Sequence, residues 1–295
     1  DFSTFSSIQV EEFMLFLIVT CLSLQNPGII QAMNWSPDAK QIIFSKKVDA
    51  VYQLFTAAVP HGEQLQITFD ATDKLFPAYS KSGQFIVFIK AIDKSNQIIR
   101  YNTESKQAEQ LTLDPESKLN PTWADNDRTI LFSMKTGDYR SIYALDIQSK
   151  QTQLISNPDY DLIYPVQSPD GKWIAVTGKK AGQKTNQIYI FKTDNFKTIQ
   201  AITENQFFNY NQAWSSDSKY LAFVSQKNQD LKSADIHVYD LESKTIEQVT
   251  NLPFGTFQIK WQPASHKISY RYGWTDDYQG IYRIDLEKKL TEQLF

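Results

Sequence analysis

A repeated segment constrains the fold of this chain more than any other feature of its sequence. Six stretches of eleven residues share one pattern, and they read NWSPDAKQIIF, AYSKSGQFIVF, TWADNDRTILF, VQSPDGKWIAV, AWSSDSKYLAF and KWQPASHKISY. Their second positions, the register positions, are Trp35, Tyr79, Trp123, Gln167, Trp214 and Trp261, with successive spacings of 44, 44, 44, 47 and 47 residues. Repeats of about 40 to 50 residues that contain several strands are typical of β-propellers.

The chemistry of one repeat predicts four strands. Each register position precedes a turn related to Ser-Pro-Asp-Gly, in which Pro fixes φ, Asp bonds to its own backbone and Gly tolerates positive φ. An alternating apolar run such as residues 41–44 follows, then a polar loop, a third strand such as 98–102, and a short fourth strand that ends in Leu-Thr, as at 111–112. We therefore predict an all-β protein in which residues 34–295 form a six-bladed β-propeller with four antiparallel strands per blade.

The repeat also resembles a known propeller family. The Trp-Ser-Pro-Asp-Gly-Lys turn, the Ile-Ala-Phe strand, the Ile-Tyr-x-x-Asp-Leu strand and the Leu-Thr ending are similar to the TolB-type propeller repeat of bacterial periplasmic proteins. The similarity covers six copies, roughly residues 34–295. The resemblance implies the fold, but blades of this type occur in periplasmic adaptors, in sensor domains of membrane-anchored regulators and in the gating domains of prolyl oligopeptidases. The family alone therefore does not specify a function.

Residues 1–33 precede the predicted propeller as an N-terminal segment. Their apolar run, residues 13–24, is shorter than the roughly 20 residues that cross a bilayer as a helix. It has the length of the hydrophobic region of a signal peptide, although Glu11 and Glu12 stand where basic residues are usual, and Cys21 lies in a weak match to a lipidation box. We interpret the segment either as the remnant of a signal or anchor, or as a strand, residues 16–24, that closes the ring against the last blade.

Charge and cysteine content exclude several kinds of partner and site. The formal net charge is -3, and the 30 Lys and Arg residues are spread along the chain, so we expect no basic patch for nucleic acid. Cys21 is the only cysteine, which excludes an internal disulfide and a metal site with several thiolate ligands. We expect neither a nucleic-acid partner nor a cofactor.

Patterns of known catalytic sites are absent from the sequence. It contains no Gly-x-Ser-x-Gly nucleophile elbow and no zincin, P-loop or dinucleotide-binding pattern. The three histidines, His61, His237 and His266, are predicted in two turns and one strand of different blades, so we do not expect them to converge on a metal ion. The chain is therefore predicted to be no enzyme and to have neither catalytic residues nor a metal site.

Two sets of repeated residues have a structural explanation. The turn aspartates are expected to bond to their own turns rather than to calcium, and they are Asp38, Asp125, Asp170 and Asp217. The tryptophans at the register positions are expected to pack between blades rather than to stack on a ligand.

We place a binding site at one end of the predicted central channel. If each first strand runs toward its Ser-Pro-Asp-Gly turn, the loops that join a fourth strand to the next first strand lie on one face, which we call the top face. The residues that precede the first strands then form a funnel for a partner: Phe76, Asn120, Tyr164, Tyr210 and Phe257. Acids such as Asp70, Asp114 and Asp161 flank this funnel and lysines surround it, although a solvated polar rim explains these charges equally well.

These features favour a noncatalytic propeller scaffold that binds a protein or peptide partner in the bacterial cell envelope. Such a protein is expected to be a monomer, periplasmic or otherwise extracytoplasmic, and in contact with a membrane only through its N-terminal segment. Two alternatives stay open: the periplasmic sensor domain of a membrane-anchored regulator, and a propeller lyase or hydrolase that uses the funnel. A winged-helix domain and a membrane span encoded upstream of Asp1 would identify the sensor.

Overall fold

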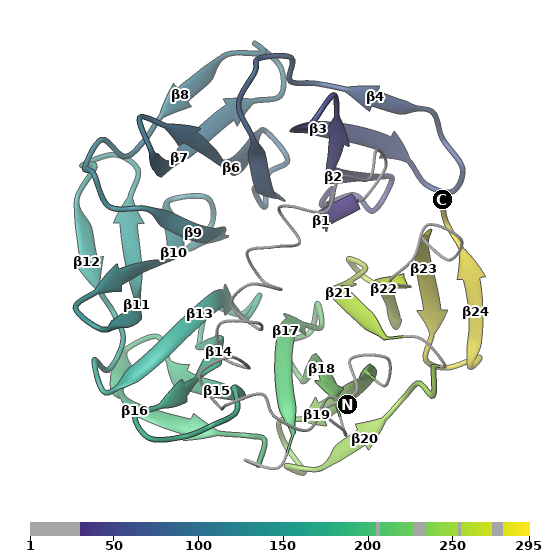
Figure 1. Ribbon diagram of the computed structural model, residues 1–295. Helices are drawn as coiled ribbons and strands as arrows, with labels where there is room; N and C mark the ends of the chain where they lie inside the picture. Colours follow the sequence, from purple (N-terminus) through teal and green to yellow (C-terminus); the bar gives the residue numbers. More distant parts are fainter. Residues whose placement is uncertain (1–29, 205–206, 227–233, 253–254, 273–279) are drawn as a thin grey trace, which may run out of the picture.

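The protein is a ring of six β-sheets (Figure 1). The computed structural model describes residues 30–204, 207–226, 234–252, 255–272 and 280–295. Within these ranges every regular element is a strand, so none of them contains a helix able to cross a membrane. The predicted roles of residues 1–29, including the closing strand at 16–24, lie outside the described residues.

The strands follow the sequence repeat, four to a blade. In chain order they are β1 (Ile30–Trp35), β2 (Gln41–Val48), β3 (Val51–Ala58), β4 (Gln64–Gln66), β5 (Lys74–Tyr79), β6 (Phe85–Ile92), β7 (Ser95–Asn102), β8 (Ala108–Gln110), β9 (Lys118–Ala124), β10 (Thr129–Thr136), β11 (Tyr139–Asp146), β12 (Thr152–Leu154), β13 (Tyr160–Gln167), β14 (Trp173–Lys180), β15 (Gln187–Lys192), β16 (Asn195–Ala201), β17 (Phe208–Trp214), β18 (Tyr220–Gln226), β19 (Ala234–Asp240), β20 (Ile246–Gln248), β21 (Thr256–Trp261), β22 (Lys267–Tyr272), β23 (Gly280–Asp285) and β24 (Leu290–Gln293).

Each blade is a four-stranded antiparallel sheet built from consecutive strands. The first strand of a blade lies next to the central channel and the fourth lies on the outer rim, as Figure 1 shows for β1 and β4. The apolar cores lie between neighbouring blades, so that Leu75 of blade 2 and Phe132 of blade 3 share one cluster. The predicted all-β, six-bladed architecture with four antiparallel strands per blade is confirmed.

The turn between first and second strands forms as its sequence predicts. Ser36 Oγ donates a hydrogen bond to Asp38 Oδ1 at 2.7 Å, and the backbone N of Lys40 donates to the same oxygen at 3.1 Å. Asp170 and Asp217 accept the equivalent bonds in blades 4 and 5. The hydroxyl of Ser36 is the main reason that the pKa of Asp38 lies below its ordinary value. These aspartates therefore stabilise their own turns.

Side chains at the register positions connect adjacent blades. Trp123 Nε1 donates to the backbone oxygen of Ala78 in the preceding blade at 3.0 Å, and Trp214 makes the same kind of bond to blade 4. Asp125 departs from the predicted turn role: its carboxylate accepts a hydrogen bond from Gln167 Nε2 of the next blade at 3.0 Å, and its backbone N donates to the same side chain. The tryptophans pack between blades as expected.

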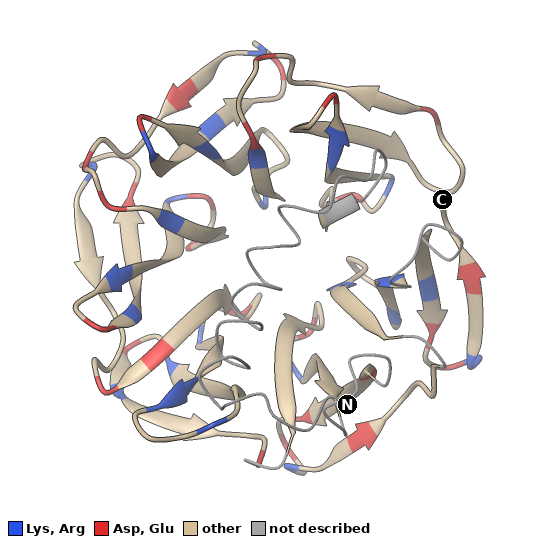
Figure 2. Cartoon of the chain, in the orientation of Figure 1, with Lys and Arg blue, Asp and Glu red and all other residues tan. Residues whose placement is uncertain are grey.

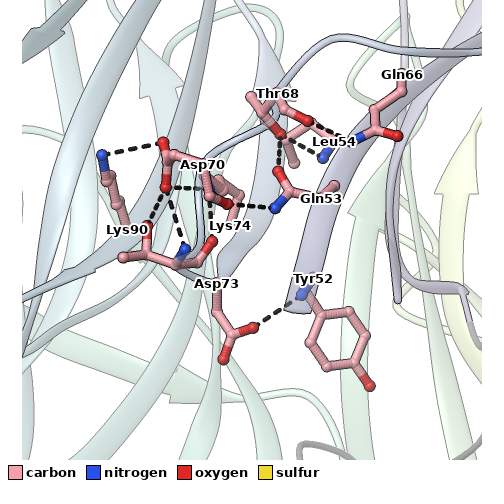
Figure 3. A network of polar contacts seen from close by, with 10 residues as sticks. Tyr52, Gln53, Leu54, Gln66, Thr68, Asp70, Asp73, Lys74 and Lys90 are labelled. Carbon is pink, nitrogen blue, oxygen red and sulfur yellow. Dashed lines mark hydrogen bonds and ion pairs between the residues drawn. The ribbon is translucent and has the colours of Figure 1, made fainter. Parts of the chain in front are cut away.

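The Leu-Thr motif, or an Ile-Thr or Val-Thr equivalent, follows the fourth strand in blades 1, 2, 4 and 5 and fixes the crossing to the next blade, as Figure 3 shows for blade 1. Thr68 Oγ1 accepts a hydrogen bond from the backbone N of Leu54 at 2.9 Å and donates to Gln53 Oε1 at 2.7 Å. Gln53 Nε2 then donates to the backbone oxygen of Asp70 at 2.6 Å. The same pairing recurs as Thr112 with Gln97, Thr203 with Gln187, and Thr250 with Asp235. Buried backbone groups are thus satisfied where the ladder ends, and the top-face loops are held in place.

The ring closes between blades 6 and 1 through packing. Ile281 and Leu294 of the last blade share an apolar cluster with Met33 and Trp35 of the first. One backbone bond crosses the junction, from His61 N to Leu294 O at 3.3 Å. No strand is exchanged between these two blades within the described ranges.

Candidate functional site

The inner strand of every blade carries an irregularity beside the channel. In blades 2 to 5 one extra residue interrupts the pairing with the second strand, which defines a β-bulge. The first residue of each bulge has positive φ, and these residues are Phe76 (54°), Asn120 (53°), Tyr164 (53°) and Asn211 (53°). In blades 1 and 6 the irregularity falls one residue earlier. Four equivalent backbone distortions therefore surround one channel.

Positive φ at these positions is costly for an aromatic side chain. Asparagine adopts the left-handed region at little cost, but aromatic residues rarely do. The conformations of Phe76 and Tyr164 therefore cost about 1 to 3 kcal/mol each. Proline follows both of them, as Pro77 and Pro165. Proline has no N–H to donate, so it fits a bulge on an edge strand, where that group has no ladder partner. The sequence thus builds the bulge, and the surrounding blades hold the strained residue in place.

The bulges line a cavity at the centre of the ring. Residues from all six inner strands contribute to its wall, and it has a volume of about 70 Å³. A water needs roughly 10 to 15 Å³ by this measure, so the cavity has room for about five waters or for the end of one side chain. Phe76, Asn120 and Tyr164, three of the five residues predicted to form the funnel, line it.

The other two predicted residues do not line this cavity. In blades 5 and 6 the wall is formed instead by the residues that follow them, Asn211 and Gln258. Tyr210 donates a hydrogen bond from its hydroxyl to the backbone oxygen of Thr256 at 3.4 Å, and burial raises its pKa well above the ordinary value. The ring of Phe257 lies 4.9 Å from the guanidinium carbon of Arg271. Both aromatics therefore take part in contacts between or within blades 5 and 6.

Two aromatic rings narrow the channel. Phe76 of blade 2 and Tyr164 of blade 4 form an edge-to-face pair with ring centroids 6.2 Å apart and planes at 75°, although blade 3 separates their strands in sequence. Between them in sequence, the buried side chain of Asn120 accepts a hydrogen bond from Ser133 Oγ at 3.2 Å. The wall of the cavity therefore combines fixed aromatic faces with amide groups.

The predicted acids form ion pairs within the protein. Figure 3 shows Asp70 between Lys74 and Lys90, at 2.5 and 3.2 Å. Burial by itself would raise the pKa of Asp70, but hydrogen bonds from these lysines hold it far below its ordinary value. Asp161 is paired with Arg140 at 2.5 Å in the same way. These contacts fix loops between blades, and Figure 2 shows both signs of charge distributed over all the blades.

Sequence reasoning did not identify Lys260. This residue of β21 lines the cavity, and burial lowers its pKa to about 8. The signal that could have revealed it is its place in the repeat, directly before the register tryptophan. The other five blades carry uncharged residues there, namely Asn34, Ala78, Thr122, Val166 and Ala213.

The histidines lie on three different blades and none lines the cavity. His61 follows β3, His266 lies in the turn before β22 beside Glu287, and His237 stacks on Phe223 within blade 5. Among the described residues, no group of three or more His, Cys, Asp or Glu side chains is arranged to hold a metal ion.

Comparison with known proteins agrees with this geometry. Residues 23–161 match the sequence profile of the TolB beta propeller domain. The structure of TolB from Acinetobacter baumannii superposes with a TM-score of 0.71 at 17% identity, and the match covers 98% of this chain and 70% of that one. The chain is a six-bladed β-propeller whose fold is similar to that of TolB. A second TolB structure, from Agrobacterium tumefaciens, matches this TolB-like propeller with a TM-score of 0.67 at 17% identity, over 80% of this chain and 87% of that one.

Enzymes share the fold as well. An oligogalacturonate lyase in complex with manganese matches the TolB-like propeller with a TM-score of 0.66 at 10% identity, over 89% of this chain and 75% of that one. Curated protein sequences give no significant match. Because the solved structures are so distant in sequence, their likeness establishes the fold of this TolB-like propeller and leaves its function to the site itself.

Proposed function

We propose that this propeller is a noncatalytic scaffold that binds an extended segment of a protein partner at its central cavity, in an extracytoplasmic compartment of a bacterium. The observation that carries the proposal is the set of bulges. Four inner strands keep a non-glycine residue at positive φ, and all four of these residues line one cavity. Backbone strain of this kind concentrates at sites that bind ligands.

The chemistry of the wall suits a peptide. Phe76 and Tyr164 present aromatic faces, while Asn211 and Gln258 present amide groups that can exchange hydrogen bonds with a peptide backbone. The volume of about 70 Å³ accommodates one side chain or chain end rather than a large substrate. A rigid ring that displays such a cavity needs no conformational change to bind an extended segment.

An enzymatic function is the rival proposal, because propellers of this fold include the lyase named above. The sequence has no Gly-x-Ser-x-Gly elbow. An assay with generic ester, peptide and oligogalacturonate substrates separates the two proposals, since a scaffold gives background rates with all three. Turnover that follows the protein through purification and is abolished by His237→Ala would refute the scaffold.

Peptide selection tests the proposal directly. Random peptides displayed on phage are selected on the immobilised full chain, and the affinities of the enriched peptides are measured for wild type and variants. Tyr164→Asn and Phe76→Asn remove an aromatic ring but keep a residue that tolerates positive φ, as at Asn120 and Asn211. Each should weaken binding by about tenfold, because a buried aromatic contact contributes roughly 1 to 2 kcal/mol.

A matched control is Phe69→Ala, which removes an aromatic ring that is 77% exposed and does not line the cavity. Its affinity for the selected peptides should equal that of wild type. Enrichment of no peptide, or an equal loss of affinity in Phe69→Ala and Tyr164→Asn, would show that the cavity is not the binding site.

A further inference from the structure

Lys260 places a positive charge in the cavity, and no residue in the described part of the chain pairs with it. It is the only charged residue among the described residues that line the wall. Its Nζ forms neither a hydrogen bond nor an ion pair with any residue in the described ranges, and desolvation is what lowers its pKa. An ammonium group removed from water without a counter-charge costs free energy. Among the described residues, the ring therefore provides no counter-charge for this cation at its centre.

Two other inner-strand lysines show how this fold uses a lysine for structure. Lys74 Nζ donates to the carboxylate of Asp70 at 2.5 Å and to two backbone carbonyl groups. Lys118 is held in the same way by the carboxylate of Asp114 and two carbonyl groups. Both side chains are 1% exposed, and their three donors are occupied. The described residues offer Lys260 no such acceptors, so the structural role of Lys74 and Lys118 does not explain its presence.

Gln258 supplies further donors beside Lys260. The two residues are two positions apart on β21, and both contribute to the wall of the cavity. Ile259 between them also borders the cavity and belongs to the apolar core of blades 5 and 6. The amide of Gln258 has two N–H groups and no hydrogen-bond partner among the described residues. An ammonium and an amide group thus face the same small space.

These donors select a ligand with one negative charge and two closely spaced acceptor oxygens. A carboxylate has both, and charge-assisted hydrogen bonds to it are the strong ones. A phosphate carries more charge than one lysine balances, and the described wall contains no second cation. The cavity volume of about 70 Å³ is also suited to a group of carboxylate size at the end of a side chain or a chain.

We propose that Lys260 and Gln258 bind a carboxylate group of the partner segment, either an acidic side chain or a free C-terminus. This inference rests on the proposed function, since it names the group that the cavity recognises in its peptide. The aromatic pair of Phe76 and Tyr164 then contacts the neighbouring apolar part of the segment, and Lys260 provides selectivity for charge.

Short peptides of defined charge test the assignment. Acetylated and amidated Gly-Glu-Gly, its Gly-Gln-Gly counterpart, acetylated triglycine with a free C-terminus, and acetate alone are each titrated into the full chain labelled with ¹⁵N. Binding constants come from the shifts of backbone amide resonances. At least one carboxylate peptide should bind about tenfold more tightly than the Gln peptide, as expected for hydrogen bonds to a charged group. The two carboxylate peptides distinguish a side chain from a C-terminus.

Variants of Lys260 assign the effect to its charge. Lys260→Gln should abolish the preference for carboxylate, and Lys260→Arg should retain most of it because the positive charge remains. Lys197→Gln is the matched control, since Lys197 is exposed on the outer strand β16, and this variant should keep the full preference.

Several results would overturn the inference. One is equal affinity for the Glu and Gln peptides, and another is an unchanged preference in Lys260→Gln. Acetate that binds as tightly as the carboxylate peptides would assign the site to small anions instead. If none of these probes binds although phage-selected peptides do, the proposed function stands and the carboxylate site is refuted; if no peptide of either kind binds, both fail.

Discussion

Replacing Lys260 with methionine should stabilise the folded protein. Methionine keeps an unbranched side chain of similar length but removes the charge. The pKa of Lys260 falls from an ordinary value of 10.5 to about 8 in the folded state. A difference of about 2.5 units corresponds to about 3 kcal/mol by which the fold disfavours the charged form. Near neutral pH the Lys260→Met variant should therefore have a free energy of unfolding higher by about 1 to 3 kcal/mol, and a Tm higher by several degrees.

The dependence of this gain on pH identifies its cause. Between pH 8 and 10.5 the unfolded chain keeps the proton that folded Lys260 has already released. The unfolded state then binds more protons, so the stability of the wild type rises with pH across this window. The advantage of Lys260→Met should be constant below pH 8 and should disappear by about pH 10.5. Urea unfolding followed by tryptophan fluorescence measures both proteins at each pH.

Lys197→Met serves as the control for this experiment, because a substitution at an exposed strand position should change stability by no more than about 0.5 kcal/mol. A Lys260→Met variant that is less stable than the wild type near neutral pH, or a stability difference that stays constant from pH 8 to 10.5, would refute the view that Lys260 is an uncompensated cation. A gain in stability together with a loss of carboxylate binding would identify a residue kept for recognition rather than for folding.

Three further substitutions test contacts that hold the blades together. Thr112→Val leaves the Oε1 of Gln97 without its donor and should lower the free energy of unfolding by about 1 to 3 kcal/mol in urea titrations, whereas Thr112→Ser should retain most of it. Gly178→Ala places a Cβ 2.1 Å from a backbone oxygen of β13, so its thermal melt should show a loss of about 3 kcal/mol or more. Burial opposes ionisation of Asp161, but hydrogen bonds and charge from Arg140 hold its pKa below 3.8. The wild type should therefore be more stable than Asp161→Asn above pH 3.8, and acid unfolding curves should converge as the pH falls below it.

Each contact can be contradicted separately. Equal urea midpoints for Thr112→Val and Thr112→Ser would show that the hydroxyl hydrogen bond is not needed. A Tm of Gly178→Ala equal to that of the wild type would show that β13 and β14 accommodate the added Cβ without loss of stability. A stability difference at Asp161 that persists unchanged in acid would assign it to packing instead of charge.

The fold was predictable because its signals are local. The turn around Asp38 and the Leu-Thr ending at Thr112 each form bonds within a few residues or with the adjacent strand. Such patterns recur in the sequence wherever the same local geometry is needed, and six copies leave little freedom in the choice of fold. The order of strands in every described blade follows from this repetition.

The exact wall of the cavity was only partly predictable. In blades 2 and 4 a proline after Phe76 and Tyr164 marks the bulge, and both residues reach the cavity. Blades 5 and 6 have no proline at this point, and there the sequence pattern favours the large aromatic residues Tyr210 and Phe257. The next residues in the chain, Asn211 and Gln258, form the wall instead. The position of a bulge depends on pairing with a neighbouring strand, which hydrophobic pattern alone does not specify.

The role of Lys260 depends on even longer-range structure. Lysine is normally a surface residue, and its sequence position shows only that its blade differs from the others. Its lack of a counter-charge among the described residues is a property of six strands that are far apart in the chain and meet at one axis. Only the assembled ring shows which acids already have partners, as Asp70 and Asp161 do.

The packed junction between the first and last blades has a consequence for how such a ring can change. Every described blade is complete in itself, and Met33 meets Leu294 across the junction much as core residues meet elsewhere in the ring. The junction therefore differs from the other five mainly in lacking a connecting peptide. A gene for this protein could begin at another blade, with the old ends joined, without dividing any sheet. By the same logic, duplication or deletion of one repeat would add or remove a whole blade, so that the circumference of the ring, and with it the width of the channel, can evolve in single steps.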